Sequence, residues 1–244
     1  MVHMCLGTGK AAGALALIGL FALAVPAGAS AHVDASVKVV HGSGSSASTA
    51  ASVNVLTIND QKGIDNRITA SMAPTGRLIL TAPEGLSDPD GGGTNCSLDN
   101  APAGQSSAQE VSCAPGYIQD ITGDLGTGND IFTADAALLV PLGGVIDGQR
   151  RPLSGGMGHD RLSGGAAPDL LDGGSGPDSL IGNGGEDLLS GGAGPDNLSG
   201  GADPDVLFGG GGVDKLNGGA ARDLCSGGGG ADSAKACELS RGIP

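Results

Sequence analysis

Nine aspartates recur at intervals of nine residues in the last third of the chain. They are Asp160, Asp169, Asp178, Asp187, Asp196, Asp205, Asp214, Asp223 and Asp232. A carboxylate is a hard oxygen donor, and the short aspartate side chain fits a tight turn around a hard cation. The residues before each aspartate are rich in glycine, so the backbone can curl and direct several carbonyl oxygens toward one point. Ligands that are all oxygen favour a hard cation such as calcium.

These aspartates belong to nine consecutive nonapeptides that run without insertion from Gly155 to Lys235. Position one is glycine in every repeat, and position six is aspartate in every repeat. Position eight is leucine in seven successive repeats: Leu162, Leu171, Leu180, Leu189, Leu198, Leu207 and Leu216. In the last two repeats Cys225 and Ala234 occupy position eight. We predict that positions one to six form a turn and that positions seven to nine form a short strand with the leucine facing inward.

Each nonapeptide then makes half a coil, and two repeats complete one coil. Because coils stack at the strand spacing of about 4.8 Å, aspartates two repeats apart lie along one edge. Five aspartates share one edge and four share the other, which gives at most about seven calcium ions held between neighbouring coils. Stacked carboxylates repel one another, so we predict that the repeats fold when they bind calcium.

The repeats resemble the RTX calcium-binding β-roll family, whose unit is GGxGxDxUx. This resemblance implies an all-β fold, a parallel β-roll or right-handed β-solenoid, in an exported bacterial protein. It also implies that the nine position-six aspartates and the carbonyls of the glycine-rich turns ligate calcium. Residues 52–134 more loosely resemble the N-terminal part of exported proteins of this kind.

Some residues depart from the repeat pattern. Position four is Ala167, Asp203 or Ala221 in three repeats, and we expect these turns to bind calcium less tightly because glycine adopts a left-handed backbone more readily. Upstream, Asp130 in GTGNDIFTA is a possible tenth ligand of a degenerate repeat, or the aspartate of a local turn, because its 30-residue distance from Asp160 breaks the nine-residue phase. Acidic residues outside position six, such as Asp172, Glu186 and Asp203, are expected to be surface charge.

The N-terminus has the pattern of a signal peptide. Lys10 precedes an apolar run from Ala11 to Val25, and we place cleavage after Ala31. The run is about 15 residues, shorter than the roughly 20 of a membrane-spanning helix, so no membrane span is expected. We therefore divide the chain into a signal peptide (1–31), a flexible leader (32–51), a small β segment with a degenerate repeat (52–148) and the β-roll (149–244).

Within the β segment, short β-type runs are expected at 52–58, 67–72 and 77–81, followed by a loop-rich stretch from 83 to 116. Four cysteines remain after the signal peptide, which in an oxidising compartment indicates two disulfides. We predict that Cys96 and Cys113 close the loop-rich stretch. We also predict that Cys225 and Cys237 cap the roll, because Cys225 replaces the leucine of earlier repeats.

The composition excludes several functions. A formal charge of −14 opposes nucleic acid, and the shortage of aromatics (one Tyr, three Phe, no Trp) opposes an ordinary substrate pocket. The three histidines after the signal peptide form no HExxH zinc pattern, so we predict no enzyme activity. We expect a secreted, extracellular or cell-surface protein that binds calcium and has a structural role. The alternative is an adhesion or partner-binding module in which the roll supports residues 52–134.

Overall fold

The computed structural model describes residues 55–59, 63, 65–87, 96–99, 107–116, 118–146 and 149–242. All regular structure in these residues is β-strand. None of them forms a helix long and apolar enough to cross a membrane. The expected signal peptide and leader lie outside the described residues.

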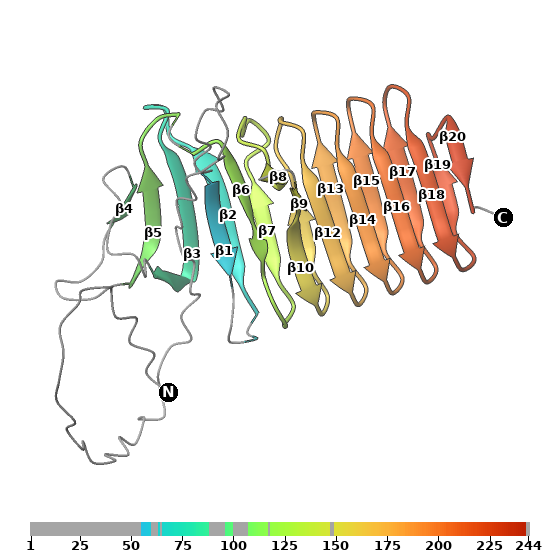
Figure 1. Cartoon of the computed structure of the whole chain (residues 1–244), viewed down its shortest axis with the longest axis horizontal. Coiled ribbons are helices and arrows are strands. Elements are labelled where there is room, and N and C mark those ends of the chain that lie inside the picture. The colour runs from blue at the N-terminus through green and yellow to red at the C-terminus, as the bar shows by residue number, and fades with distance from the viewer. Residues whose placement is uncertain are drawn as a thin grey trace, which may run out of the picture.

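Most strands belong to two long sheets that run side by side along the molecule (Figure 1). The eight-stranded sheet has, in spatial order, β1 (Val55–Asn59), β6 (Asp120–Asp124), β10 (Leu153–Met157), β12 (Leu170–Ser175), β14 (Leu188–Ala193), β16 (Val206–Gly211), β18 (Leu224–Gly229) and β20 (Leu239–Arg241). The ten-stranded sheet has β19 (Ser233–Lys235), β17 (Lys215–Gly219), β15 (Asn197–Gly201), β13 (Ser179–Asn183), β11 (Arg161–Ser163), β7 (Ile131–Ala134), β2 (Arg67–Met72), β3 (Leu78–Ser87), β5 (Ser107–Cys113) and β4 (Cys96–Asp99).

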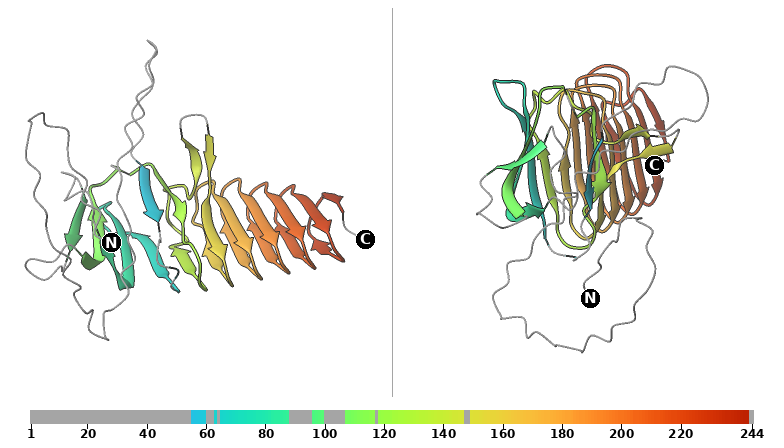
Figure 2. Two further views of the ribbon diagram at one scale, coloured as in Figure 1. Left: turned by 60° about the horizontal axis from the view of Figure 1, so that its bottom comes forward. Right: turned by 60° about the vertical axis from the view of Figure 1, so that its left-hand side comes forward.

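From β10 onward the chain passes alternately between the two sheets, so that each pair of repeats makes one coil (Figure 2). Successive coils pair in parallel with an offset of 18 residues, as in Leu171↔Leu189 and Leu180↔Leu198. This is the parallel β-roll that the sequence predicts. Within the repeats, this 18-residue offset stacks like positions on like positions.

The core of the roll is a ladder of position-eight leucines from both sheets. All seven are at most 2% exposed, and Cys225 continues the ladder at 0%. In β13 the burial alternates along the strand, with Leu180 at 0% and its neighbour Ile181 at 41%. The ladder is one side chain wide on each sheet, so each coil buries little apolar area.

The strands are longer than the sequence predicts. β12 and its equivalents include the glycines at positions one and two and the residue at position three, as in Leu170–Ser175. The turn on that side is correspondingly reduced to positions four to six. Glycine at position one faces the interior in the alternation of the strand, so its missing side chain leaves space inside the roll.

The β segment upstream of the repeats continues the roll. β1 and β6 pair in parallel at the start of the eight-stranded sheet, and β2 and β7 pair in parallel in the ten-stranded sheet. Strand β7 pairs with β11 as another coil would, with Phe132 opposite Leu162 and Ile131 opposite Arg161. The expected break of phase at Asp130 is therefore wrong. The extra residues leave the coil as a β8–β9 hairpin (Gly144–Ile146 and Gln149–Arg151), and the coil resumes at β10.

The N-terminal end of the roll is covered by an antiparallel extension. β3, β5 and β4 pair antiparallel beyond β2 in the ten-stranded sheet. The stretch 83–116, expected to be loop-rich, thus contains half of β3 and all of β4 and β5. Cys96 and Cys113 lie directly opposite each other on β4 and β5 and form the predicted disulfide. The pairing gives small polar residues a strand partner, which their local composition does not reveal.

The second predicted disulfide joins Cys225 to Cys237 at the opposite end. Cys225 lies in β18, and Cys237 immediately precedes the last strand, β20. Beyond Cys225 the ladder ends with the small residue Ala234, which is only partly buried. The covalent link therefore holds the last strand of the eight-stranded sheet where apolar packing is weakest.

Candidate metal sites

The position-six aspartates lie at the turns along the two edges of the roll. We call edge one the turns that lead from the eight-stranded to the ten-stranded sheet, and edge two the turns that lead back. Edge one carries Asp130, Asp160, Asp178, Asp196, Asp214 and Asp232, and edge two carries Asp169, Asp187, Asp205 and Asp223. Each of these carboxylates is at most 5% exposed.

A continuous column of hydrogen bonds joins the aspartates of each edge. On edge one the backbone N–H of Asp178 donates to Oδ1 of Asp196 at 2.8 Å, and that of Asp196 donates to Oδ1 of Asp214 at 2.9 Å. On edge two the N–H of Asp187 donates to Oδ1 of Asp205 at 2.9 Å. Each carboxylate therefore fastens the coil before it.

The second oxygen, Oδ2, is buried and accepts no hydrogen bond from the described residues in eight of the nine repeats. These atoms belong to Asp160, Asp178, Asp187, Asp196, Asp205, Asp214, Asp223 and Asp232. In the ninth, Asp169, Oδ2 accepts the backbone N–H of Gly165 at 2.9 Å. A buried carboxylate oxygen without a donor is costly, and it is the kind of atom that a metal ion satisfies.

Glycine at position one makes room for this carboxylate. A Cβ at Gly173 would lie 2.6 Å from Oδ2 of Asp178, in the same repeat, and 2.6 Å from the carbonyl oxygen of Gly191. The other position-one glycines meet the aspartate of their own repeat in the same way. The invariant glycine and the invariant aspartate are thus two parts of one packing arrangement.

Burial raises the pKa of several of these carboxyls. It raises the pKa of Asp178 to about 7 and that of Asp187 to about 8, against the lowering effect of the backbone N–H that each accepts. Like charges one coil away raise both further. For Asp169, Asp196 and Asp205 burial raises the pKa to about 6. Near neutral pH, then, these five carboxyls without a cation are distributed between charged and neutral forms.

The carboxylate oxygens fit calcium, but a complete site would also need carbonyl oxygens of the backbone. No three or more His, Cys, Asp or Glu side chains within the described part of the chain are grouped as a metal site. An ion at an edge would take carboxylate oxygens from neighbouring coils together with carbonyl oxygens of the turns. That all-oxygen donor set is the one that calcium prefers.

Comparison with known protein families agrees with this geometry. A family model for the RTX calcium-binding nonapeptide repeat matches the chain four times, at residues 154–189, 163–198, 190–224 and 199–234. Residues 154–234 are RTX calcium-binding repeats. No curated protein and no solved structure matches the chain significantly.

The roll places all nine predicted RTX aspartates in register, on the edges expected for them. Asp130 joins them: its N–H donates to Oδ1 of Asp160 at 2.8 Å, so it continues edge one. Of the acids expected at the surface, Glu186 and Asp203 are exposed, whereas Asp172 is half-buried, and burial raises its pKa.

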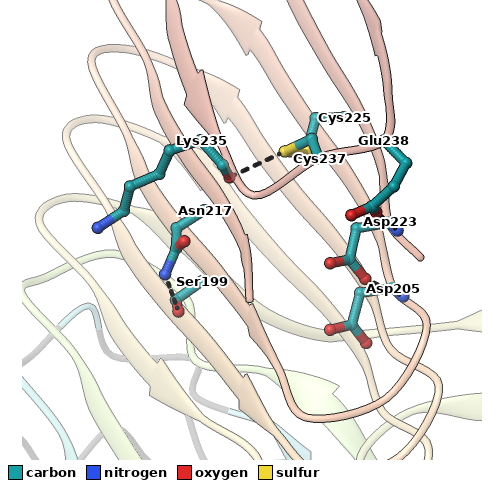
Figure 3. The surroundings of a disulfide bond; sticks show 8 residues. All are labelled: Ser199, Asp205, Asn217, Asp223, Cys225, Lys235, Cys237 and Glu238. Carbon is teal, nitrogen blue, oxygen red and sulfur yellow. Dashed lines mark hydrogen bonds between the residues drawn. A yellow bond between two sulfur atoms is a disulfide. The ribbon is translucent and has the colours of Figure 1, made fainter. Parts of the chain in front are cut away.

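Two residues that sequence reasoning missed, Asn66 and Glu238, extend the two columns, and a third, Asp120, lies near the start of one of them. Asn66 is the first member of edge one, since its N–H donates to Oδ1 of Asp130 at 2.7 Å. Asp120 lies near Asp169 at the start of edge two, and burial raises its pKa to about 7. Glu238 ends edge two, where it accepts the N–H of Asp223 at 2.6 Å, in line with Asp205 (Figure 3). In the sequence, Asn66 and Asp120 could have been recognised because each is an acid or amide that directly precedes β-type residues.

The three position-four substitutions differ from one another in backbone conformation. Ala221 has a left-handed φ of 73°, which costs energy for a residue with a Cβ. Ala167 and Asp203 do not have a positive φ. The predicted backbone strain therefore applies to Ala221 alone.

The role of the position-one glycine is testable within one RTX repeat. Gly209→Ala should destabilise the calcium-loaded roll by about 2 kcal/mol or more, because the new Cβ would meet Asp214 and, at 2.6 Å, the Gly227 carbonyl. Gly211→Ala is the matched control, since a Cβ there meets nothing within 4 Å. The measurement is denaturant unfolding in saturating calcium. Equal losses for both variants would show that the carboxylate does not occupy that space.

The raised pKa values predict how pH acts on the calcium-free RTX repeats. The folded state binds more protons than the unfolded state from about pH 4 to about pH 8, because the folded pKa of Asp178 and Asp187 exceeds the ordinary 3.8. Stability without calcium should therefore fall as pH rises through this window. We expect metal-free protein to show more far-ultraviolet β signal at pH 5 than at pH 8. A β signal of metal-free protein that increases with pH would contradict these pKa directions.

Proposed function

We propose that this protein is an exported calcium-binding protein whose RTX repeats fold into a β-roll when they bind calcium, and that its role is structural. The carrying observation is the set of eight buried Oδ2 atoms without a hydrogen-bond donor, repeated at each coil. A single such atom would be a local irregularity. Eight in register are a property of the fold that an oxygen-binding cation explains.

The free energies of burial and of calcium binding favour folding that depends on calcium. One buried leucine contributes about 1.5–3 kcal/mol, whereas burying one unpaired carboxylate costs several kcal/mol. Six of the nine repeats have one of each, and two more have the unpaired carboxylate without a leucine, so the leucine ladder alone does not offset the carboxylates when they are ionised. Calcium at millimolar concentration, bound with a dissociation constant of about 10⁻⁴ to 10⁻³ M, adds about 0.4–1.4 kcal/mol per site.

Calcium removal is the direct test of this function. At pH 7.5 the chelated protein should lose the far-ultraviolet β signal of the repeats, and calcium should restore it in one cooperative step. Magnesium at equal ionic strength is the control and should restore much less, because it requires smaller, near-octahedral sites. An unchanged β signal after chelation, or equal action of the two metals, would contradict the proposal.

Export is the second part of the proposal. Both cysteine pairs lie close enough for disulfides, which form and persist in oxidising compartments outside the cytosol. The apolar segment at 11–25 is the signal that would direct the chain there. N-terminal sequencing of protein recovered from the culture medium should begin at His32. A chain found only inside cells, with Met1 retained, would count against export.

A structural role fits the architecture better than a separate partner-binding segment. Strands β1, β2, β6 and β7 belong to the same two sheets as the repeats, so the upstream segment is built into the roll. Among residues upstream of 149 whose exposure the structure describes, the exposed large apolar side chains are Met72 and Leu139. Adhesion through residues 52–134 therefore has no apolar patch in the described part of that segment to support it.

A further inference from the structure

The two edges of the roll differ in the composition of their turns. On edge one, positions two and four are glycine in all five repeats that carry Asp160, Asp178, Asp196, Asp214 and Asp232. On edge two, position four is Ala167, Gly185, Asp203 and Ala221 in succession, and position two is asparagine in one repeat. The consensus of the array as a whole conceals this difference, because the two kinds of turn alternate along the chain.

The backbone of edge one repeats almost without change. Its position-two glycines have φ between +96° and +109°, and its position-four glycines have φ between +122° and +149°. On edge two the corresponding angles vary: φ is positive at Gly185 and Ala221 but not at Ala167 or Asp203. An ion held between two coils would take carbonyl oxygens from both turns, and turns with the same backbone present the same oxygens at each step. Edge one offers that match at each step, and edge two does not.

Hydrogen bonds between coils also differ. On edge one the position-four N–H donates forward to the position-three carbonyl of the next coil, as in Gly176 to Ala193 at 2.7 Å and Gly194 to Gly211 at 2.7 Å. On edge two the position-three N–H donates backward to the position-two carbonyl, as in Ala202 to Asn183 at 2.9 Å. The two turns therefore leave different carbonyl oxygens available for a ligand.

Side chains on edge two already accept some of the turn's own N–H groups. Both oxygens of Asp169 accept backbone N–H groups, from Leu142 and Gly165. Asp203 accepts the N–H of Gly185 at 3.0 Å, in the turn one coil earlier. At the C-terminal end of edge two the column ends at Glu238, whose carboxylate accepts the backbone N–H of Asp223 as an aspartate does in the other coils. These contacts are made between groups of the protein itself, although Oδ2 of Asp187, Asp205 and Asp223 still accepts no hydrogen bond from the described residues.

We propose that calcium binds along edge one, and that the edge-two aspartates hold neighbouring coils together through backbone hydrogen bonds without binding calcium. This inference rests on the proposed calcium function and restricts it to Asp130, Asp160, Asp178, Asp196, Asp214 and Asp232. The buried Oδ2 atoms occur on both edges, so the repeated glycine backbone distinguishes them. Edge one thus binds the metal, and edge two contributes hydrogen bonds between neighbouring coils.

Asp196→Asn and Asp205→Asn form a matched pair of tests in the full-length chain. Both residues are interior, nine positions apart, and an asparagine carbonyl can still accept the N–H donated by Asp178 or Asp187. Asp196→Asn should remove about two calcium sites in titration calorimetry and raise the calcium concentration at the folding midpoint. Asp205→Asn should leave the number of sites unchanged.

The outcomes separate this inference from the function on which it rests. A natural chain that binds no calcium would overturn the proposed function itself. A chain that binds calcium but loses as many sites in Asp205→Asn as in Asp196→Asn would overturn only the division between the edges.

A second variant keeps every position-six aspartate, so it remains informative if Asp196→Asn does not fold. The triple change Ala167→Gly, Asp203→Gly and Ala221→Gly gives edge two the position-four glycines of edge one. It should bind more calcium ions than the natural chain. An unchanged number of ions would show that position-four glycine does not decide where calcium binds, and would contradict the proposal.

Discussion

The burial of stacked carboxylates is the constraint on which the rest of this structure depends. Each position-six aspartate is buried, and one of its oxygens accepts the N–H of the equivalent residue one coil earlier. The other oxygen has no donor from the described residues in eight repeats. Glycine at position one follows from this arrangement, because the carboxylate occupies the space of its side chain. Within the repeats, the 18-residue coil keeps each column in register.

A thin core explains why the roll needs support at its ends. The interior of the repeats, all of which the structure describes, is a leucine ladder without tryptophan or tyrosine. Each coil contacts mainly its neighbours, so stability accumulates coil by coil. Terminal coils have a neighbour on one side only. At the start, the antiparallel strands β3, β5 and β4 cover the ten-stranded sheet, with Cys96 linked to Cys113. At the finish, the Cys225–Cys237 disulfide and Glu238 hold the last strand.

The regular features were predictable from sequence, because the nine-residue period fixes both side-chain direction and coil length. The aspartate columns and the leucine ladder are of this kind, whereas the two disulfides were predicted from the four cysteines that remain after the signal peptide. The place of Asp130 was not predictable, because the β8–β9 hairpin leaves the coil and returns without disturbing the stack, so spacing along the chain does not measure spacing along the roll. Glu238 was missed for the same reason, since it is 15 residues from Asp223 rather than 18. The strands at 96–113 depend on partners distant in sequence.

Hydrogen exchange along the whole chain would test most directly whether calcium holds the buried carboxylates in place. At neutral pH the amides of residues 155–235 should be protected together in saturating calcium. In chelator they should exchange as in an unfolded chain, because each position-six N–H then loses the carboxylate that it donates to. Equal protection of these amides with and without calcium would contradict the account, since the leucine ladder and the backbone bonds would then suffice to hold the roll.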